Sequence, residues 1–443
     1  AASDVYKRQG LAFPHAEFRP GQRHLAESVY KAALSGRHLM AQAPTGIGKT
    51  VATIFPLLKA SPGQKLDKIF FLAAKTPGRG LALDALELIR AGKDKEDAVL
   101  PLRVLELVAR DKACEHPDKA CHGESCPLAQ GFYDRLAAAR EAAVRASSLD
   151  QQSLRTIALA HQVCPYYLSQ DLVRWSDVVV GDYNYYFDTS AMLYGLTVEN
   201  DWRTAVLVDE AHNMVERARK MYSAELTQSS FRVARKSAPK SLRTVLDRVN
   251  RLWNDLYRDQ ETEYAVYHAI AEKFLFALQQ AGTDITDLMT DEPDSVSPEL
   301  QRFYFDAMQF SKLAEVFGEH SMFDITRSMS LASKPQATLC IRNIVPAPFL
   351  KQRFTTAHTV TLFSATLGPH HFYADMLGLP DDTAWVDVES PFHAQQLAVR
   401  IASTISTRYQ HRPRSVAPIA RLIAEQYNNC LLYTSDAADE RSS

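Results

Sequence analysis

One stretch constrains the fold more than any other, namely Ala43-Pro44-Thr45-Gly46-Ile47-Gly48-Lys49-Thr50, because an apolar run lies on each side of it. An apolar run, a glycine loop and a second apolar run predict a strand, a tight turn and a helix. In such a loop the backbone N–H groups bind phosphate oxygens, the lysine reaches the outer phosphates, and the last hydroxyl ligates Mg²⁺. We therefore predict an α/β domain that binds a nucleotide through Thr45, Gly46, Gly48, Lys49 and Thr50.

A second apolar run, Val206 to Val208, ends in the adjacent carboxylates Asp209 and Glu210, and His212 follows. Continuous apolar runs of this length are typical of strands buried inside parallel sheets. We predict that Asp209 holds Mg²⁺ through water and that Glu210 polarises the attacking water. An acidic helix N-cap is the alternative for such a pair, but the glycine loop favours the catalytic reading.

Two stretches close to the glycine loop supply further binding candidates. Arg19 and Gln22 precede an amphipathic helix and are predicted to hydrogen-bond the adenine; the alternative is an ordinary helix start after Pro20. The apolar run 68–74 is followed by a loop that carries Thr76 and Arg79. Because ligands bind at the carboxyl ends of parallel strands, these two side chains are predicted to contact phosphodiester oxygens, unless the loop is a solvated turn.

Two later strands end in residues that suit contact with single-stranded nucleic acid. Tyr183, Asn184 and Tyr185 follow a valine-rich run and are predicted to stack on bases, with buried packing as an equal alternative. Ser364 and Thr366 end the apolar run 359–363 and are predicted to link a γ-phosphate sensor to the bound strand.

Four cysteines between these motifs lie in polar surroundings with the spacing C-x6-C-x4-C-x37-C: Cys114, Cys121, Cys126 and Cys164. Four thiolates suit either tetrahedral Zn²⁺ or an iron–sulfur cluster. Zinc sites usually contain C-x2-C pairs, and none is present, so the spacing favours the cluster. The chain has six cysteines and no secretory signal, which indicates a reducing, cytoplasmic compartment.

Composition and charge narrow the classes of protein to which the chain can belong. The 443 residues are 46% hydrophobic and 23% charged, and no apolar run approaches the roughly 20 residues that span a bilayer. The net charge of −2 requires any nucleic-acid contact to come from a local groove.

Residues 225–336 show a helical period, which predicts an inserted helical subdomain. Residues 1–10 and 432–443 lack the patterns of the rest and are predicted to be non-native.

Taken together, these motifs resemble those of the XPD/DinG-like iron–sulfur helicases of superfamily 2. The matching segments are 18–22 (Q-type motif), 43–50 (motif I), 76–79 (motif Ia), 209–212 (D-E-A-H, motif II) and 364–366 (S-A-T, motif III). The four cysteines, closed by Cys-Pro-Tyr-Tyr at 164–167, and Gly-Asp-Tyr-Asn-Tyr at 181–185 distinguish this branch from others. The resemblance covers roughly residues 11 to 430.

The resemblance implies a set of domains. Residues 11–105, 169–224 and 337–392 would form the first RecA-like domain, a parallel-sheet P-loop ATPase domain. Residues 106–168 would form an inserted iron–sulfur domain, residues 225–336 a helical arch domain, and residues 393–431 the start of a second RecA-like domain with its first strand near 427–432. Most of that second domain, including its arginine finger, is expected to be missing, so we expect little activity from this chain alone.

The implied function is that of a monomeric, ATP-dependent DNA helicase. It would use ATP, Mg²⁺ and a [4Fe-4S] cluster and would move 5′ to 3′ on single-stranded or tailed duplex DNA in repair or replication. Two alternatives remain open on the residues alone. One is an ATP-gated nucleic-acid switch or clamp that never unwinds, and the other is an iron–sulfur or zinc binding module.

Overall fold

A computed structural model of the chain describes residues 11–92, 100–119, 121–292, 295–329, 335–396, 399 and 401–429. The chain divides into two units after Pro391. The first unit contains two β-sheets, and the second contains the helix α18 (Arg412–Asn429). No helix in the described ranges is long and apolar enough to cross a membrane.

The larger sheet has eight strands in the order β12-β1-β11-β6-β2-β5-β3-β4, and every neighbouring pair runs parallel. In chain order its strands are β1 (Leu39–Gln42), β2 (Lys68–Ala73), β3 (Val104–Glu106), β4 (Ser148–Leu149), β5 (Val178–Gly181), β6 (Thr204–Asp209), β11 (Thr359–Ser364) and β12 (Ala384–Asp387). The predicted RecA-like α/β fold is therefore confirmed.

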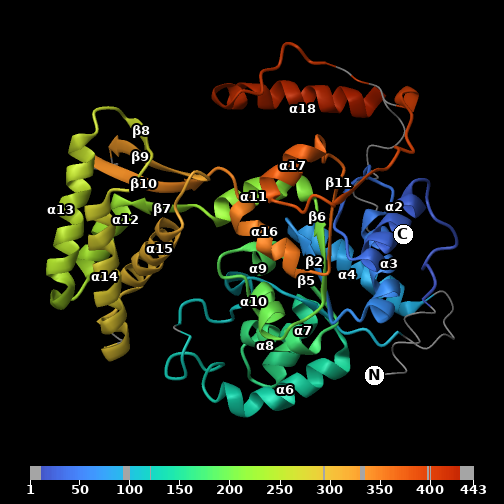
Figure 1. Ribbon diagram of the computed structural model, residues 1–443, viewed down its shortest axis with the longest axis horizontal. Coiled ribbons are helices and arrows are strands. Elements are labelled where there is room, and N and C mark those ends of the chain that lie inside the picture. Colours follow the sequence, from blue (N-terminus) through green and yellow to red (C-terminus); the bar gives the residue numbers. More distant parts are fainter. Residues whose placement is uncertain are drawn as a thin grey trace. The chain divides into compact units, whose positions relative to one another are not determined.

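Helices cover both faces of this sheet (Figure 1). Alternate residues of β6 point to opposite faces, so Leu207 packs with α2 (Gln22–Ser35), α3 (Lys49–Gln64) and α4 (Thr76–Ala91). Val208 packs on the other face with α8 (Pro165–Leu172), α10 (Met192–Glu199), α11 (Met214–Met221) and α16 (Ala347–Thr356). Because both faces are buried, every residue of β6 is buried, which explains the continuous apolar run.

The strand register brings the motif-bearing loops to one edge of the sheet. Gln42 of β1 pairs with Ser364 of β11. Asp209 of β6 lies level with Phe363 on one side and Ala73 of β2 on the other. The carboxyl ends of β1, β11, β6 and β2 therefore coincide, and this is the edge at which α/β proteins bind ligands.

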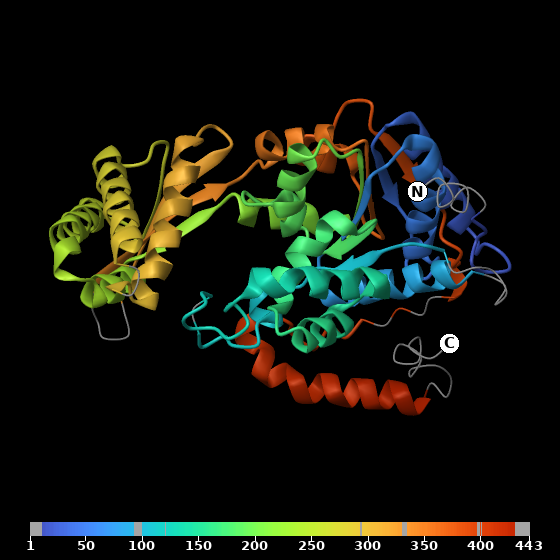
Figure 2. The same ribbon diagram turned by 90° about the horizontal axis from the view of Figure 1, so that it is seen from below.

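The cysteine-containing segment leaves the sheet after β3. It comprises α5 (Arg110–Ala113), α6 (Phe132–Ala146), β4, α7 (Gln151–Ala160) and α8, with the short η1 (Val173–Trp175) leading back to β5. Two views show α6 with α7 and α8 beside this part of the sheet (Figures 1 and 2). The helices α6 and α7 are separated by β4, which pairs with β3.

The prediction that residues 225–336 are entirely helical is wrong. The segment contains α12 (Gln228–Ser237), η3 (Lys240–Leu242), α13 (Arg243–Asp259), α14 (Glu272–Asp291) and α15 (Pro298–Glu315), but also an antiparallel sheet of order β7-β10-β9-β8. Its strands are β7 (Ala224–Thr227), β8 (Tyr264–Tyr267), β9 (Ser321–Met329) and β10 (Pro335–Asn343). Phe323, Asp324 and Ile325 are buried in succession in β9 and the rest of the strand is exposed or half-buried, so the strand lacks the period-two alternation that would have identified it in the sequence.

Two predicted boundaries also change. Because β10 pairs with β7 and β9, the segment returns to the large sheet only after Asn343, and not at residue 337. At the C-terminal end, residues 427–429 belong to α18, so the first strand predicted near 427–432 is not present in its described part. The rest of that predicted strand lies outside the described residues, as do both predicted non-native ends.

The remaining elements are short or peripheral: α9 (Asn184–Phe187), η2 (Ala211–Asn213), α17 (His370–Leu377), η5 (Ala394–Gln396) and η6 (Tyr409–His411).

Candidate active site

The glycine loop joins β1 to α3 and has the backbone that its glycines permit. Gly46 and Gly48 have φ angles of 86° and 77°, and Gly48 is the N-cap of α3. The loop therefore presents the N-terminus of a long helix to an anion, with Thr45 and Gly46 exposed and Thr50 half-buried in the first turn.

The Lys49 ammonium donates to the carbonyl oxygen of Pro44 within the loop, over 3.3 Å. Burial lowers the pKa of Lys49, and the negative charges of Glu210 and Asp209 act against that shift. The lysine thus faces the carboxylates that the sequence predicted, and it reaches the space where the outer phosphates of a nucleotide would lie.

Arg19 and Gln22 contact the loop itself. An Arg19 guanidinium nitrogen donates to the Gly46 carbonyl oxygen over 2.9 Å. The Gln22 amide nitrogen donates to the Gly48 carbonyl oxygen over 3.2 Å, while its oxygen accepts from the Arg19 N–H over 2.9 Å. Gln22 is buried. These residues were predicted to read adenine, but in this structure they brace the phosphate loop.

Asp209 is the buried carboxylate of the site, at 8% exposure. Burial and then the neighbouring charge of Glu210 raise its pKa to about 6, and the Glu210 N–H donates to its Oδ1 over 2.9 Å. A buried carboxylate with a raised pKa lacks full compensation for its charge. Together with the Thr50 hydroxyl it is an oxygen-only donor set, which fits the Mg²⁺ that the fold implies.

The Glu210 side chain belongs to a small polar network with motif III. The Ser364 hydroxyl donates to Glu210 Oε2 over 3.2 Å, and His212 Nδ1 lies 2.7 Å from the Ser364 oxygen and 3.2 Å from Glu210 Oε2. The Thr366 N–H also donates to the Ser364 oxygen, over 3.4 Å. His212, Ser364 and Glu210 are thus held together, as predicted for coupling, whereas the fully buried Ser364 cannot contact nucleic acid.

Tyr183 lies under this site and not on the surface. Its side chain is fully buried, and its hydroxyl donates to the carbonyl oxygens of Asp209 and Glu210, the latter over 3.0 Å. The predicted base-stacking role of Tyr183 is therefore wrong, because no face of the ring is open to a base. Its contact with the backbone of the D-E-A-H turn was missed, because β2 lies between β5 and β6 in the sheet and no local sequence pattern relates the two strands.

The other predicted DNA contacts are divided between surface and interior. Thr76, Asn184 and Thr366 are exposed, and Tyr185 is half-buried. Arg79 is buried, and its Nε donates to Glu106 Oε1 over 3.3 Å. The prediction that Arg79 contacts phosphodiesters is thus corrected to an ion pair inside the protein. Arg79, Asn184 and Tyr185 line one pocket of about 380 Å³, and Arg217, which also lines it, donates to the Asn184 side-chain oxygen over 2.8 Å.

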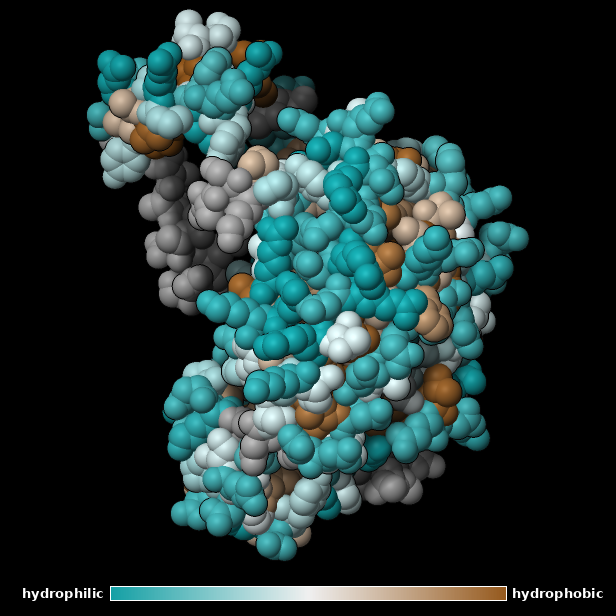
Figure 3. Space-filling model, turned by 90° about the vertical axis from the view of Figure 1, so that its left-hand side faces the viewer, coloured by the Kyte–Doolittle hydropathy of each residue, from teal (hydrophilic) through white to brown (hydrophobic). Residues whose placement is uncertain are grey.

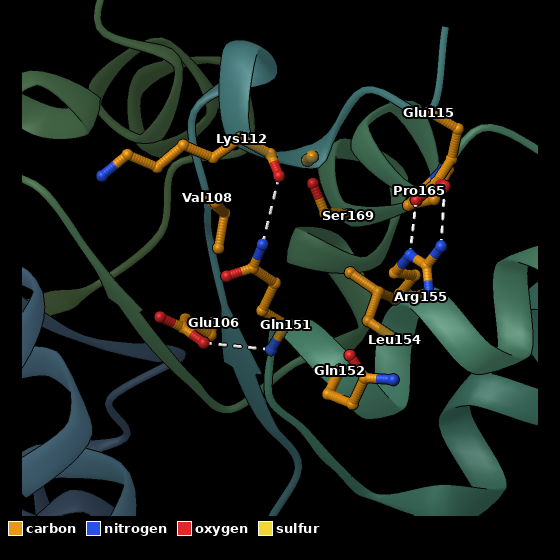
Figure 4. Close-up of a pocket in the computed structure, with 11 residues that line it drawn as sticks. Glu106, Val108, Lys112, Glu115, Gln151, Gln152, Leu154, Arg155, Pro165 and Ser169 are labelled. Atoms are coloured by element: carbon orange, nitrogen blue, oxygen red, sulfur yellow. Dashed lines mark hydrogen bonds and ion pairs between the residues drawn. The ribbon is translucent and has the colours of Figure 1, made fainter.

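Glu106 also connects this edge to the cysteine-containing segment. Its second oxygen accepts the Gln151 N–H at the start of α7 over 3.0 Å. Figure 4 shows it at the rim of a pocket of about 280 Å³, in which the Gln151 side chain donates to the Lys112 carbonyl oxygen and Arg155 pairs with Glu115 at 2.6 Å. The Lys112 ammonium extends away from this pocket (Figure 4). The charged side chains that line the pocket, Glu106, Glu115 and Arg155, are therefore paired with other groups of the protein.

The four cysteines predicted to bind a cluster lie in or next to the connections of that segment. Cys114 follows α5, Cys164 is the N-cap of α8, and all four are free thiols. Burial raises the pKa of Cys164, and the thiols of Cys114 and Cys126 are near enough to add to the shift. Four thiols fit the chemistry of an iron–sulfur cluster. Within the described residues, however, no three metal-binding side chains are gathered in ligand geometry.

Comparisons of the sequence with protein families give two adjoining matches. A model described as "DEAD/DEAH box helicase" matches residues 23–113, and one described as "DEAD_2" matches residues 102–231. Together they span the phosphate loop, the cysteines and the D-E-A-H residues.

Curated relatives include a regulator of telomere elongation helicase 1 homolog from Anopheles gambiae, 25% identical over 53% of this chain and 28% of that protein. The regulator of telomere elongation helicase 1 from Homo sapiens is 28% identical over 28% of this chain and 11% of that protein. The chain thus matches well under half the length of each of these relatives.

Two solved structures share the fold. One, described as an XPD helicase, aligns with a TM-score of 0.57 and 18% identity over 93% of this chain and 71% of that chain. A second, described as a truncated XPD, aligns with a TM-score of 0.52 and 16% identity over 82% of this chain and 99% of that chain.

Proposed function

This chain is an XPD/DinG-like sequence of helicase superfamily 2, and from that premise we propose that it carries the ATP-hydrolysing site of a DNA helicase. One observation carries the proposal. Lys49, Asp209 and Glu210 converge at the carboxyl edge of one parallel sheet, and Ser364 of the neighbouring strand bonds to Glu210 there. Phosphate, metal and water positions are then set by rigid elements.

Each residue has a defined task in this site. Lys49 and the N-terminus of α3 bind the β- and γ-phosphates, and Thr50 and Asp209 hold Mg²⁺, which supplies neutralisation of the phosphate charge. Glu210 orients the attacking water and accepts its proton. His212 and Ser364 hold the Glu210 carboxylate through the bonds described above, so that movement of motif III reaches the water-activating group.

The test of the hydrolysis proposal uses two lysines of the same helix. Lys49→Ala should lower ATP turnover of the full-length protein by about 100-fold or more, because an electrostatic contact to the transferred phosphoryl group is lost. Lys59→Ala is the control, because Lys59 Nζ bonds to the Leu11 carbonyl oxygen, away from the loop. A steady-state ATPase assay in which the two variants turn over alike would exclude the proposed role of Lys49.

We further propose that ATP hydrolysis drives a monomer 5′ to 3′ along single-stranded DNA, in repair or replication. Thr76, Asn184 and Thr366 are exposed near the carboxyl edge of the sheet and can contact a strand there. The side of the molecule seen in Figure 3 is mostly hydrophilic. Duplexes with a 5′ or a 3′ single-stranded tail test the direction. Unwinding of the 3′-tailed duplex alone contradicts it, and hydrolysis without unwinding of either favours the ATP-gated clamp.

For the cysteine-containing segment we propose a [4Fe-4S] cluster bound by Cys114, Cys121, Cys126 and Cys164, supported by the four free thiols and by the nearness of two of them to Cys164. Cys164→Ser should lose the iron on anaerobic purification. Cys340→Ser is the matched control, because Cys340 is a buried thiol in β10 of the other sheet. About one zinc and no iron per wild-type chain would reject the cluster in favour of a zinc site.

A further inference from the structure

We infer that Tyr183 is a positioning residue for the water-activating Glu210, and that it acts through the backbone of the D-E-A-H turn. The inference rests on the proposed ATPase function and adds to it a residue outside the five helicase motifs named above. Tyr183 ends the connection after β5, and β2 separates β5 from β6 in the sheet. Its side chain therefore spans the width of β2 to meet the backbone carbonyl oxygens of Asp209 and Glu210.

The backbone of Glu210 needs to be held in place. Glu210 has a φ of 51° and a ψ of 45°, the left-handed region that a residue with a side chain adopts at a cost. Such a conformation persists where its surroundings enforce it, and it is common at active sites. Here it turns the chain sharply between β6 and η2, so that the Asp209 and Glu210 carboxylates lie at the same edge of the sheet.

The enforcing contacts converge on the Glu210 carbonyl oxygen. The Tyr183 hydroxyl donates to it over 3.0 Å, the Asn213 N–H over 2.9 Å, and the Asn213 side-chain amide over 3.1 Å. Tyr183 also donates to the Asp209 carbonyl oxygen. Because carbonyl and side chain share one set of backbone angles, fixing the carbonyl direction fixes the direction in which the Glu210 carboxylate leaves the chain.

Tyr183 is itself fixed from the far side of the turn. Its neighbours Asp182 and Asn184 both accept hydrogen bonds from Arg217 of α11, the latter over 2.8 Å, and the Arg217 guanidinium lies 5.9 Å from the Tyr183 ring centroid. The residues before and after Tyr183 are thus tied to the helix that follows the D-E-A-H turn. The segment 182–184 is therefore joined to the D-E-A-H turn twice, through Tyr183 in the interior and through Arg217 of α11.

This arrangement makes a specific kinetic prediction. Glu210 acts on the attacking water and not on the bound nucleotide, so loss of the Tyr183 hydroxyl should lower kcat and leave KM for ATP within about twofold. One hydrogen bond to a backbone carbonyl that orients the catalytic group corresponds to roughly tenfold in rate. Tyr183→Phe should therefore lower kcat about tenfold in the full-length protein.

Tyr186→Phe is the matched control. Tyr186 is also fully buried, and its hydroxyl donates to a backbone carbonyl, that of Arg353, over 3.1 Å, but it does not contact the D-E-A-H turn. Both variants lose one buried hydroxyl proton, which Tyr183 shares between two carbonyl oxygens and Tyr186 donates to one, so their thermal unfolding midpoints should fall by similar amounts. Only Tyr183→Phe should lose turnover, whereas a merely structural role would lower turnover equally in both.

The possible results separate the inference from the function on which it rests. A kcat for Tyr183→Phe equal to that of Tyr186→Phe overturns the inference alone. If wild-type protein does not hydrolyse ATP, the proposed function fails and the inference fails with it. Should Tyr183→Phe not fold, Asn213→Ala decides, because it removes another side-chain donor to the same carbonyl and should also lower kcat at unchanged KM. Wild-type turnover in Asn213→Ala would then overturn the inference.

Discussion

Asp209 is the residue at which folding and function conflict most clearly. A carboxylate at 8% exposure is destabilising when ionised, yet a metal ligand must be ionised at neutral pH. Its pKa of about 6 in the nucleotide-free chain expresses that conflict. The Lys49 ammonium already acts against the raised pKa, and Mg²⁺ would relieve the conflict further, so the site is expected to be more stable with the metal bound.

The raised pKa makes a prediction about stability and pH. An aspartate whose folded-state pKa lies above its unfolded value stabilises the fold when protonated, below about pH 4, and this contribution is lost as the pH rises through about 6. Asp209→Asn stays neutral. Without nucleotide it should be more stable than wild type at pH 8 by up to roughly 3 kcal/mol, and the gap should shrink towards pH 4.

Urea unfolding of both proteins, at pH values about half a unit apart between about pH 4.5 and about pH 8, measures that gap. Asp387→Asn is the control, since it removes an exposed carboxylate at the end of the edge strand β12 of the same sheet and should change stability little. A gap that is independent of pH, or a less stable Asp209→Asn at pH 8, would contradict the burial of an under-compensated charge.

The sequence predicted the chemistry of the site well, but it predicted less well what each residue contacts in the fold. Lys49, Asp209, Glu210 and His212 lie together because their motifs fix which strand end each one occupies. The interior roles of Arg79 and Tyr183 did not follow from the sequence. Whether an arginine pairs with Glu106 or faces a phosphate depends on residues far away in the chain, which no local pattern records.

At the scale of elements, the junction of β1 and α3 depends on its glycines. A Cβ on Gly48 would lie against the Gln22 side-chain amide, well inside contact distance, and its φ of 77° is costly for other residues. The Gln22 amide also donates to the Gly48 carbonyl oxygen, so a side chain at residue 48 would disturb the hydrogen bond that braces the loop.

Gly48→Ala should therefore weaken nucleotide binding at least tenfold, because either the loop backbone or Gln22 must move. Gly63→Ala is the control on the same helix: nothing lies within 4 Å of an added Cβ there, and alanine is favoured over glycine in helices by up to about 1 kcal/mol. Titration of each variant with a fluorescent ATP analogue measures the effect. Equal affinities would show that the loop tolerates a side chain at residue 48.

The order of the elements was predicted well in the large sheet and poorly in the inserted segment. Buried parallel strands are continuous apolar runs, and β2, β5, β6 and β11 were all visible in the sequence for that reason. The strands β8 and β9 belong to an antiparallel sheet with exposed residues on one side. Neither strand has a period-two alternation of burial, and both lie next to long amphipathic helices, whose helical period is the stronger signal in the sequence.

At the scale of the whole molecule, the large sheet collects residues from distant parts of the chain at one edge. The glycine loop, the loop after β2, the D-E-A-H turn and motif III are separated by up to some 320 residues in sequence, as the ladder from Gln42 to Ser364 shows. Between them the chain inserts the cysteine-containing segment and the segment with the second sheet. Both insertions begin and end near this sheet, so their movements can reach the site through its strand ends.

The most direct test of the central claim is the Glu210→Gln variant of the full-length protein, measured for Mg²⁺-ATP affinity and for turnover with single-stranded DNA. Glutamine keeps the size of the side chain but cannot accept the proton from water. We predict an affinity within about threefold of wild type and a DNA-stimulated turnover at least 100-fold lower. Turnover close to that of wild type would contradict the claim that this edge of the sheet hydrolyses ATP.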